Sequence, residues 1–149
     1  MRLGTKGLLR FVGFPQECRR LLIRAFFLVL VIRLLLWVLP FTSLQKVLKS
    51  FHPRASPPAS DDIPPARIAW AVTVASRYVL RATCLVRALA TQVLLGRAGR
   101  SSVLHIGVMK GDRAPIEAHA WVEAEGRIII GGSAAVLYTK LASLEYEIK

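Results

Sequence analysis

The spacing of the apolar residues changes once along the chain, near Ser102. Before this point apolar residues recur every three or four positions, as on one face of a helix. Residues 64–79 show this spacing, with Ile68, Val72, Ala75 and Val79 on one face. After it, apolar and polar residues alternate in the segments SVLHIGVMK, IEAHAWVEAEG and RIIIGG, and the last two are joined by a tight turn at Glu125–Gly126. The sequence therefore predicts an α+β fold in which helices precede an antiparallel sheet.

The first 51 residues are expected to form an apolar helical region, with helices at about Pro15–Leu39 and Thr42–Ser50 that Pro40 separates. The longest charge-free run of this region, Ala25–Ile32, ends at Arg33. A membrane span needs about 20 apolar residues and would place Arg33 within the bilayer. Burial of the apolar faces against the rest of the protein or a partner subunit is therefore favoured, and membrane association is the alternative.

A segment rich in proline, serine and aspartate, HPRASPPASDDIPPA, follows this helical region. Such a composition is typical of a loop or linker. The expected organisation is thus an apolar helical region at residues 1–51, a linker at residues 52–65 and a folded core at residues 66–149.

The charge of the chain is strongly positive. Its 149 residues include 21 Lys and Arg against nine Asp and Glu, which gives a net charge of +12. This charge suits an anionic partner such as a nucleic acid, a membrane surface or an acidic polypeptide. The arginines are scattered among leucines and form no basic run interleaved with aromatic residues, which argues against nucleic-acid binding.

The chain has two cysteines, Cys18 and Cys84, far apart in the sequence. They suggest no disulfide framework, and no set of cysteines and histidines has the spacing of a zinc site. We therefore expect a reducing, cytoplasmic setting, and we expect neither a metal nor another cofactor.

Cys84 is expected in the first turn of a helix that Thr83 caps and that Gly96 and Gly99 end. Free backbone N–H groups and the helix dipole stabilise a thiolate at such a position, and neighbouring arginines add positive potential. Cys84 is therefore a candidate nucleophile. The alternative is a small buried residue, because cysteine is among the most buried residue types.

His119 lies in the middle of an alternating segment, on the face opposite the apolar residues Ile116, Ala118, Ala120 and Val122. If those residues face the core, the imidazole faces something else. A cysteine on a helix that faces a histidine on a strand is the working pair of papain-like and transglutaminase-like enzymes. The alternative is a hydrogen-bonded surface histidine, and His105 fits that description better than His119 does.

The segments RATCLVRALATQVLLGRAG, LHIGVMK and AHAWVEAEGRIIIGG resemble the transglutaminase-like cysteine protease of lasso-peptide biosynthesis, the B protein. The resemblance covers Ile68–Gly132. It implies a transglutaminase-like core in which a helix packs on an antiparallel sheet. It also implies that Cys84 attacks the peptide bond between the leader and the core of a ribosomal precursor peptide, with His119 as the general acid and base.

The resemblance also implies partners. Residues 1–60 do not resemble the leader-recognition domain that often precedes this protease, so the match is to the split form of the B protein. In that form a separate leader-binding protein presents the precursor, and a separate cyclase closes the macrolactam ring after cleavage. The expected location is the cytoplasm, or its membrane surface if the N-terminal helices attach there.

One position departs from the family pattern, in which an acidic residue on the strand after the histidine orients the imidazole. A two-residue turn at Glu125–Gly126, continued as a regular ladder, places Gly132 opposite His119. Since glycine has no side chain, a backbone carbonyl, a water or a nearby acid such as Glu117 must orient the ring, or the register must slip. Glu123 shares the face of His119 but lies about 13 Å along the strand, which is too far for a direct bond.

Two other functions fit the same residues. A catalytically silent scaffold would hold the precursor, the leader-binding protein and the cyclase together, and the glycine at the place of the acid supports it. An acyl transferase would use the same Cys84–His119 pair to pass an acyl group to an amine instead of water.

Overall fold

The computed structural model describes residues 15–40, 42–44, 46, 63–109, 116–132 and 138–146. The helices are α2 (Gln16–Val38), α4 (Pro65–Ser76) and α5 (Cys84–Arg97), and residues 42–44 and 46 are also helical. The strands are β1 (Ser102–Met109), β2 (Glu117–Ala124), β3 (Arg127–Ile130) and β4 (Thr139–Tyr146). The expected α+β class is confirmed, with helices first and an antiparallel sheet second.

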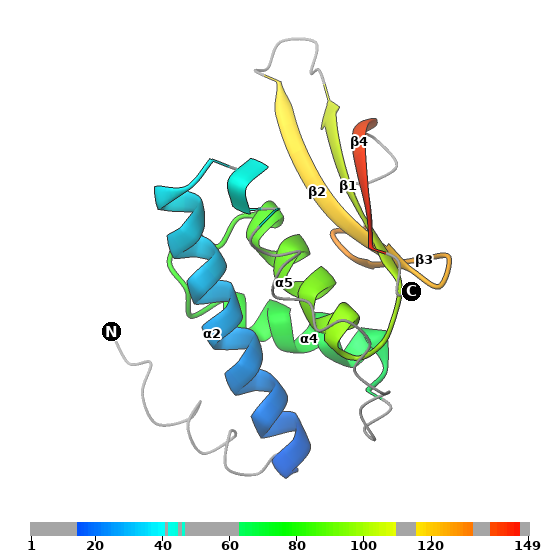
Figure 1. Ribbon diagram of the computed structural model, residues 1–149. Helices are drawn as coiled ribbons and strands as arrows, with labels where there is room; N and C mark the ends of the chain where they lie inside the picture. The colour runs from blue at the N-terminus through cyan, green and yellow to red at the C-terminus, as the bar shows by residue number, and fades with distance from the viewer. Residues whose placement is uncertain are drawn as a thin grey trace.

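Helix α5 is the central element of the fold. It packs against α2 and α4 on one side and against β1 and β2 on the other (Figure 1). Because it is covered on both sides, most of its residues are small or apolar, and one polar residue, Thr91, is fully buried with its hydroxyl bonded to the Arg87 carbonyl at 2.9 Å. Its buried residues are Val86, Ala88, Leu89, Ala90, Thr91, Val93, Leu94 and Leu95.

The four strands form one sheet in the order β3-β2-β1-β4, and all the pairs are antiparallel. Leu104, Ala120 and Val122 belong to the buried core that the sheet shares with α5. The tips of β1 and β2 extend beyond the helices (Figure 1). The expected core role of Ile116 and Ala118 is therefore wrong: Ile116 is 71% exposed and Ala118 is exposed, because none of the described helices covers this end of the sheet.

Helix α2 agrees with the expected helix at Pro15–Leu39 to within one residue at each end. One face of it is buried against α4 and α5, and that face consists of Leu21, Leu22, Ala25, Val29 and Ile32. The second expected helix, Thr42–Ser50, is seen only at residues 42–44 and 46, and its other residues lie outside the described part of the chain. Most of the expected linker, residues 52–62, also lies outside it.

Candidate functional site

Cys84 is the first residue of α5, and the helix start is built as the sequence predicts. The Thr83 side chain caps the helix by accepting the amide N–H of Val86 at 3.5 Å. The amide N–H of Cys84 itself has no acceptor within the helix, since it belongs to the first turn. The Cys84 side chain is half-buried against the apolar core. Three residues earlier, Arg81 has a left-handed φ of 59°, which is uncommon for a residue other than glycine and marks a tight turn into α5.

His119 is half-buried on β2, and one of its ring nitrogens has a definite partner. Nε2 lies 3.0 Å from the carbonyl oxygen of Gly131. A carbonyl oxygen only accepts, so Nε2 must donate, and in the neutral ring the proton is on Nε2. The other nitrogen, Nδ1, is then free of a proton and can act as a base.

Gly131 can place its carbonyl at His119 because it is glycine. Its φ is +84°, in the region that favours glycine. A Cβ at this position would lie 2.8 Å from Cβ of Trp121 and 2.9 Å from the carbonyl oxygen of Ala120. Any larger residue would therefore shift the backbone and move the carbonyl away from the ring.

The expected pairing of Gly132 with His119 is wrong. The turn pairs Ala124 with Arg127 as predicted, but the ladder then slips, so that Val122 pairs with Ile130 and not with the residue before it. The extra residue, Ile129, forms a β-bulge. Because of the slip, the ring meets a backbone carbonyl near the end of β3, which is one of the alternatives that the sequence leaves open.

Tyr138, just before β4, completes the surroundings of His119 and was not expected from the sequence. Its ring stacks on the imidazole with the ring centroids 5.0 Å apart, and its hydroxyl donates to Oε2 of Glu117 at 3.5 Å. Burial, the charge and hydrogen bond of Glu117, and the charge of Cys84 raise the pKa of Tyr138 above its ordinary value. Tyr138 thus stacks on His119, and its pKa also depends on the charge of Cys84.

The comparisons with known proteins decide the family. The model of the transglutaminase-like superfamily matches residues 26–143, which is most of the chain. The protein belongs to the transglutaminase-like superfamily. Neither the curated proteins nor the solved structures include a match. The matched range begins within α2 and includes Cys84, His119 and Tyr138, so the transglutaminase-like domain contains every residue of the candidate site.

The structure places the two candidate catalytic residues of this transglutaminase-like protein on different elements. Cys84 lies on α5, whereas alternation along β2 points His119 away from the face of Ala120 and Val122 that packs on α5. No hydrogen bond joins the Cys84 thiol to the His119 ring, whose Nε2 is bonded to Gly131. A direct contact between thiol and imidazole therefore stays a prediction.

The other candidate residues have separate partners. Glu123 bonds to Nε2 of His105 at 3.3 Å, and Nδ1 of the same ring lies 2.9 Å from the hydroxyl of Ser143. His105 is therefore hydrogen-bonded as expected, but it is only 7% exposed, so it is not a surface residue. Cys18 is a half-buried free thiol in the first turn of α2. Within the described residues no group of three His, Cys, Asp or Glu could hold a metal ion.

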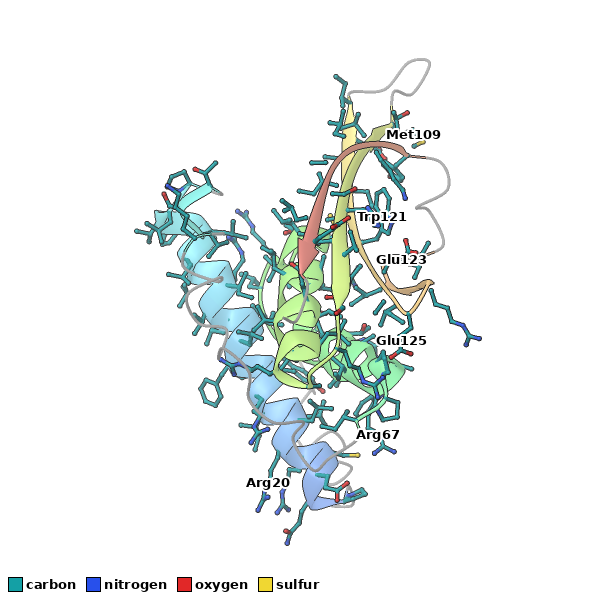
Figure 2. The ribbon with its side chains drawn as sticks, turned by 45° about the vertical axis from the view of Figure 1, so that its right-hand side comes forward. Arg20, Arg67, Met109, Trp121, Glu123 and Glu125 are labelled. Carbon is teal, nitrogen blue, oxygen red and sulfur yellow. The ribbon has the colours of Figure 1, made fainter. Side chains whose placement is uncertain are left out.

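A cavity of about 440 Å³ lies at the turn end of the sheet. His105, Glu123, Glu125 and Ser143 are among its lining residues, and neither Cys84 nor His119 is. Figure 2 shows Trp121 and Glu123 on the side of the sheet that faces away from α2. Because this cavity lies apart from the thiol and the imidazole, it does not mark where a substrate of Cys84 would bind.

Proposed function

We propose that this transglutaminase-like protein is a cysteine protease that removes the leader from a lasso precursor peptide, with Cys84 as the nucleophile and His119 as the general acid and base. The proposal is supported by the superfamily match and by the resemblance of the Cys84 and His119 segments to the lasso B protein. The observation that carries it is the held imidazole: Nε2 of His119 is bonded to a carbonyl, which leaves Nδ1 as a base.

The reaction follows from these groups. Nδ1 of His119 takes the thiol proton, and Sγ of Cys84 forms a bond to the carbonyl carbon between leader and core. The C–N bond breaks, the departing amine receives the proton from His119, and a thioester to the leader remains. Water, deprotonated by His119, then hydrolyses the thioester and frees the thiol. The amide N–H of Cys84 is the nearest donor for the oxyanion, since it is unpaired in the first turn of α5.

The mechanism requires the thiol and the imidazole to meet. Hydrogen bonds between catalytic groups are often long in the unliganded enzyme and tighten when substrate binds. Because Gly131 holds only Nε2, the Nδ1 edge of the ring is the edge that must face Cys84. A precursor peptide, presented by a separate leader-binding protein, would supply the binding energy that brings the thiol and the imidazole together. A separate cyclase would then act on the core peptide that cleavage releases.

The test compares the two cysteines. Cys84→Ala should abolish leader removal, while Cys18→Ala should keep it, because only Cys84 lies at a capped helix start within the matched domain. The measurement is the mass of the precursor after incubation with the full-length protein and the leader-binding protein. His119→Ala should also be inactive. Cleavage by Cys84→Ala at the parental rate would end the cysteine-protease proposal.

Acyl transfer is the second candidate, because the transglutaminase-like superfamily includes acyltransferases as well as cysteine proteases. The same thioester would then be attacked by an amine. Product mass separates the two reactions, since hydrolysis adds water and transfer adds the amine.

A silent scaffold is the third candidate, favoured by the lack of a hydrogen bond between Cys84 and His119. A scaffold does not need an activated thiol, so in a scaffold Cys84 should be alkylated no faster than Cys18. Comparing the two alkylation rates therefore tests this candidate.

A further inference from the structure

Helix α2 carries an apolar stripe that no described element covers. The stripe residues follow each other at intervals of three or four, which places them on one side of the helix. They are Ile23 (44% exposed), Phe27 (58%), Val31 (47%), Leu34 (53%) and Val38 (77%). Trp37, beside the stripe at the end of the helix, is 82% exposed. A run of large apolar side chains of this length is typical of an interaction surface.

The opposite side of α2 fixes how such a surface can be used. Ala25, Val29 and Ile32 are fully buried against the rest of the domain. Among the described helices α2 is the one long and apolar enough to cross a membrane, with a mean hydropathy of 2.5. If α2 crossed a membrane, those three residues would leave the core. The stripe can therefore contact a partner only if α2 lies flat on the partner's surface.

The N-terminal part of the sequence, which contains α2, is strongly basic and so favours an anionic partner. Residues 1–60 contain ten Lys and Arg and one acidic residue, Glu17, so they carry nine of the twelve net positive charges of the chain. Arg20 and Arg24 are exposed on α2 itself. Arg20 lies on the line of the stripe, three positions before Ile23, and Arg24 flanks it. Figure 2 shows Arg20 near the N-terminal end of α2, on the outside of the molecule.

We propose that α2 docks in the plane of an anionic membrane surface, with the stripe inserted among the lipids and Arg20 and Arg24 at the phosphate level. Apolar residues flanked by arginines suit an interfacial helix. The exposed Trp37 suits the same depth, because indole rings gather at membrane interfaces. A second copy of this basic chain would have to cover the stripe without an acidic rim, and it is an outcome of the test below. This docking does not depend on the protease proposal.

The docked orientation leaves the candidate site open. Helix α2 and the sheet lie on opposite sides of α5 (Figure 1). A membrane under α2 therefore faces away from His119 and Tyr138, and a precursor peptide could reach them from the cytoplasmic side.

The experiment is co-sedimentation of the full-length chain with vesicles. Vesicles of phosphatidylcholine containing about 30% phosphatidylglycerol should bind it at least about tenfold more tightly than vesicles of pure phosphatidylcholine. Raising the salt from about 0.1 M to about 1 M should weaken the binding, since it shortens the screening length from about 10 Å to about 3 Å. Equal retention on both vesicles, or retention on neither, would overturn the proposal.

Two pairs of substitutions locate the surface. Phe27→Glu with Leu34→Glu should abolish vesicle binding. Ile116→Glu with Leu141→Glu, which change even more exposed apolar residues just before β2 and in β4, should not. Arg20→Glu with Arg24→Glu should lower binding to anionic vesicles by about tenfold or more. Circular dichroism checks that each protein is folded. Vesicle binding that survives the Phe27 and Leu34 changes would overturn the proposal.

Depth and oligomeric state separate docking from its rivals. If α2 lies flat on the membrane, an alkaline carbonate wash should release the protein from the vesicles. Retention on the vesicles after the wash would mean that the helix spans the bilayer, which contradicts the proposal. Brominated lipids should quench Trp37 most when the bromines are shallow, and Trp37→Phe should remove that quenching. Finally, a dimer in solution that the Phe27 and Leu34 changes dissociate, without vesicle binding, would assign the stripe to a second copy of the chain instead.

Discussion

Gly131 holds the imidazole of His119 through its backbone carbonyl, whereas the protease family that the sequence resembles uses an acidic side chain to orient this ring. The carbonyl accepts a hydrogen bond from Nε2–H and so fixes the tautomer of the ring, as a carboxylate would. It has only a partial charge, however, and stabilises the imidazolium of the reaction less than a carboxylate does. Turnover should therefore be slow and should depend on where this one carbonyl lies.

Gly131→Ala tests the carbonyl at the residue scale, with Gly132→Ala as its matched control. The φ of +84° and the close approach to Trp121 mean that alanine at position 131 must displace the backbone. At position 132 a Cβ meets only the side chain of Ile128, whose Cγ2 lies 3.3 Å away. We expect Gly131→Ala to lower kcat by about tenfold or more, equivalent to about 1.4 kcal/mol, and Gly132→Ala to leave it nearly unchanged.

A second readout keeps this prediction independent of activity. Long-range nitrogen–proton spectra of the His119 ring report which nitrogen carries the proton, and Gly131→Ala should shift His119 from a single Nε2–H tautomer toward a mixture. A folded Gly131→Ala protein with parental kcat and an unchanged His119 spectrum would contradict the positioning role of this carbonyl.

Tyr138 offers a direct test of where Cys84 lies. Its pKa is raised by burial, by Glu117 and by the charge of Cys84, so the phenol stays protonated to higher pH than an ordinary tyrosine. Cys84→Ser and Glu117→Gln each remove one negative charge that opposes phenolate formation, and each should lower the pKa of Tyr138. Neither should bring it fully to the ordinary value, because burial remains.

Ultraviolet difference titration against Tyr138→Phe isolates this phenol from the other tyrosines. The control is Cys18→Ser, since Cys18 does not act on Tyr138. If Cys84→Ser and Cys18→Ser leave identical titrations of Tyr138, the Cys84 thiol is not near this ring, and the catalytic pair of Cys84 and His119 loses its support.

At the scale of elements, local signals predicted α5, its Thr83 cap and the turn at Glu125–Gly126. Each depends on neighbours in sequence: a capping hydroxyl three residues from the amide that it accepts, or two residues with φ of 54° and 71° in the turn. The end of α5 was less accurate, because the helix continues through Gly96 and stops only near Gly99, which has a φ of 71°.

Strand β4 was not predicted, and a β-bulge is the physical reason. Ile106 pairs with Ala142 and Gly107 with Lys140, so Leu141 is an extra residue in the strand. The extra residue reverses the alternation of apolar and polar side chains, and TKLASLEY loses the period of two that marks a strand. The bulge at Ile129 has the same effect on the register beside His119. Bulges depend on pairing between strands, which a single sequence does not display.

The burial of Trp121 also depends on distant residues. Alternation placed it on the polar face with His119, yet it is 1% exposed. Its indole lies over Gly107 on the neighbouring strand, where a Cβ would come within 3.0 Å of the ring. It also lies between His105, whose ring is tilted against it at a centroid distance of 5.4 Å, and His119, whose ring stacks on it at 6.3 Å. The partners of His119, Gly131 and Tyr138, were missed for the same reason, whereas Cys84 and His119 became candidates through local pattern and resemblance, and their catalytic roles stay a prediction.

At the scale of the whole molecule, α2 has two faces with different tasks. Its inner face belongs to the core of a transglutaminase-like domain whose matched range begins inside this helix. Its outer face carries the apolar stripe, in the part of the chain that holds most of the net positive charge. Stability and membrane docking should therefore respond to substitutions on opposite sides of one helix.

Val29 and Val31 separate the two tasks, because they are the same residue type two positions apart, 0% and 47% exposed. Val29→Asp places a carboxylate in the core without a partner and should cost more than about 3 kcal/mol of unfolding free energy. Val31→Asp should change it by about 1 kcal/mol or less, yet it should weaken binding to anionic vesicles, since it puts a negative charge within the stripe. Urea unfolding and vesicle co-sedimentation of the two proteins give the answer. If Val31→Asp unfolds the protein as Val29→Asp does, the outer face is also part of the core, and the surface assigned to α2 does not exist.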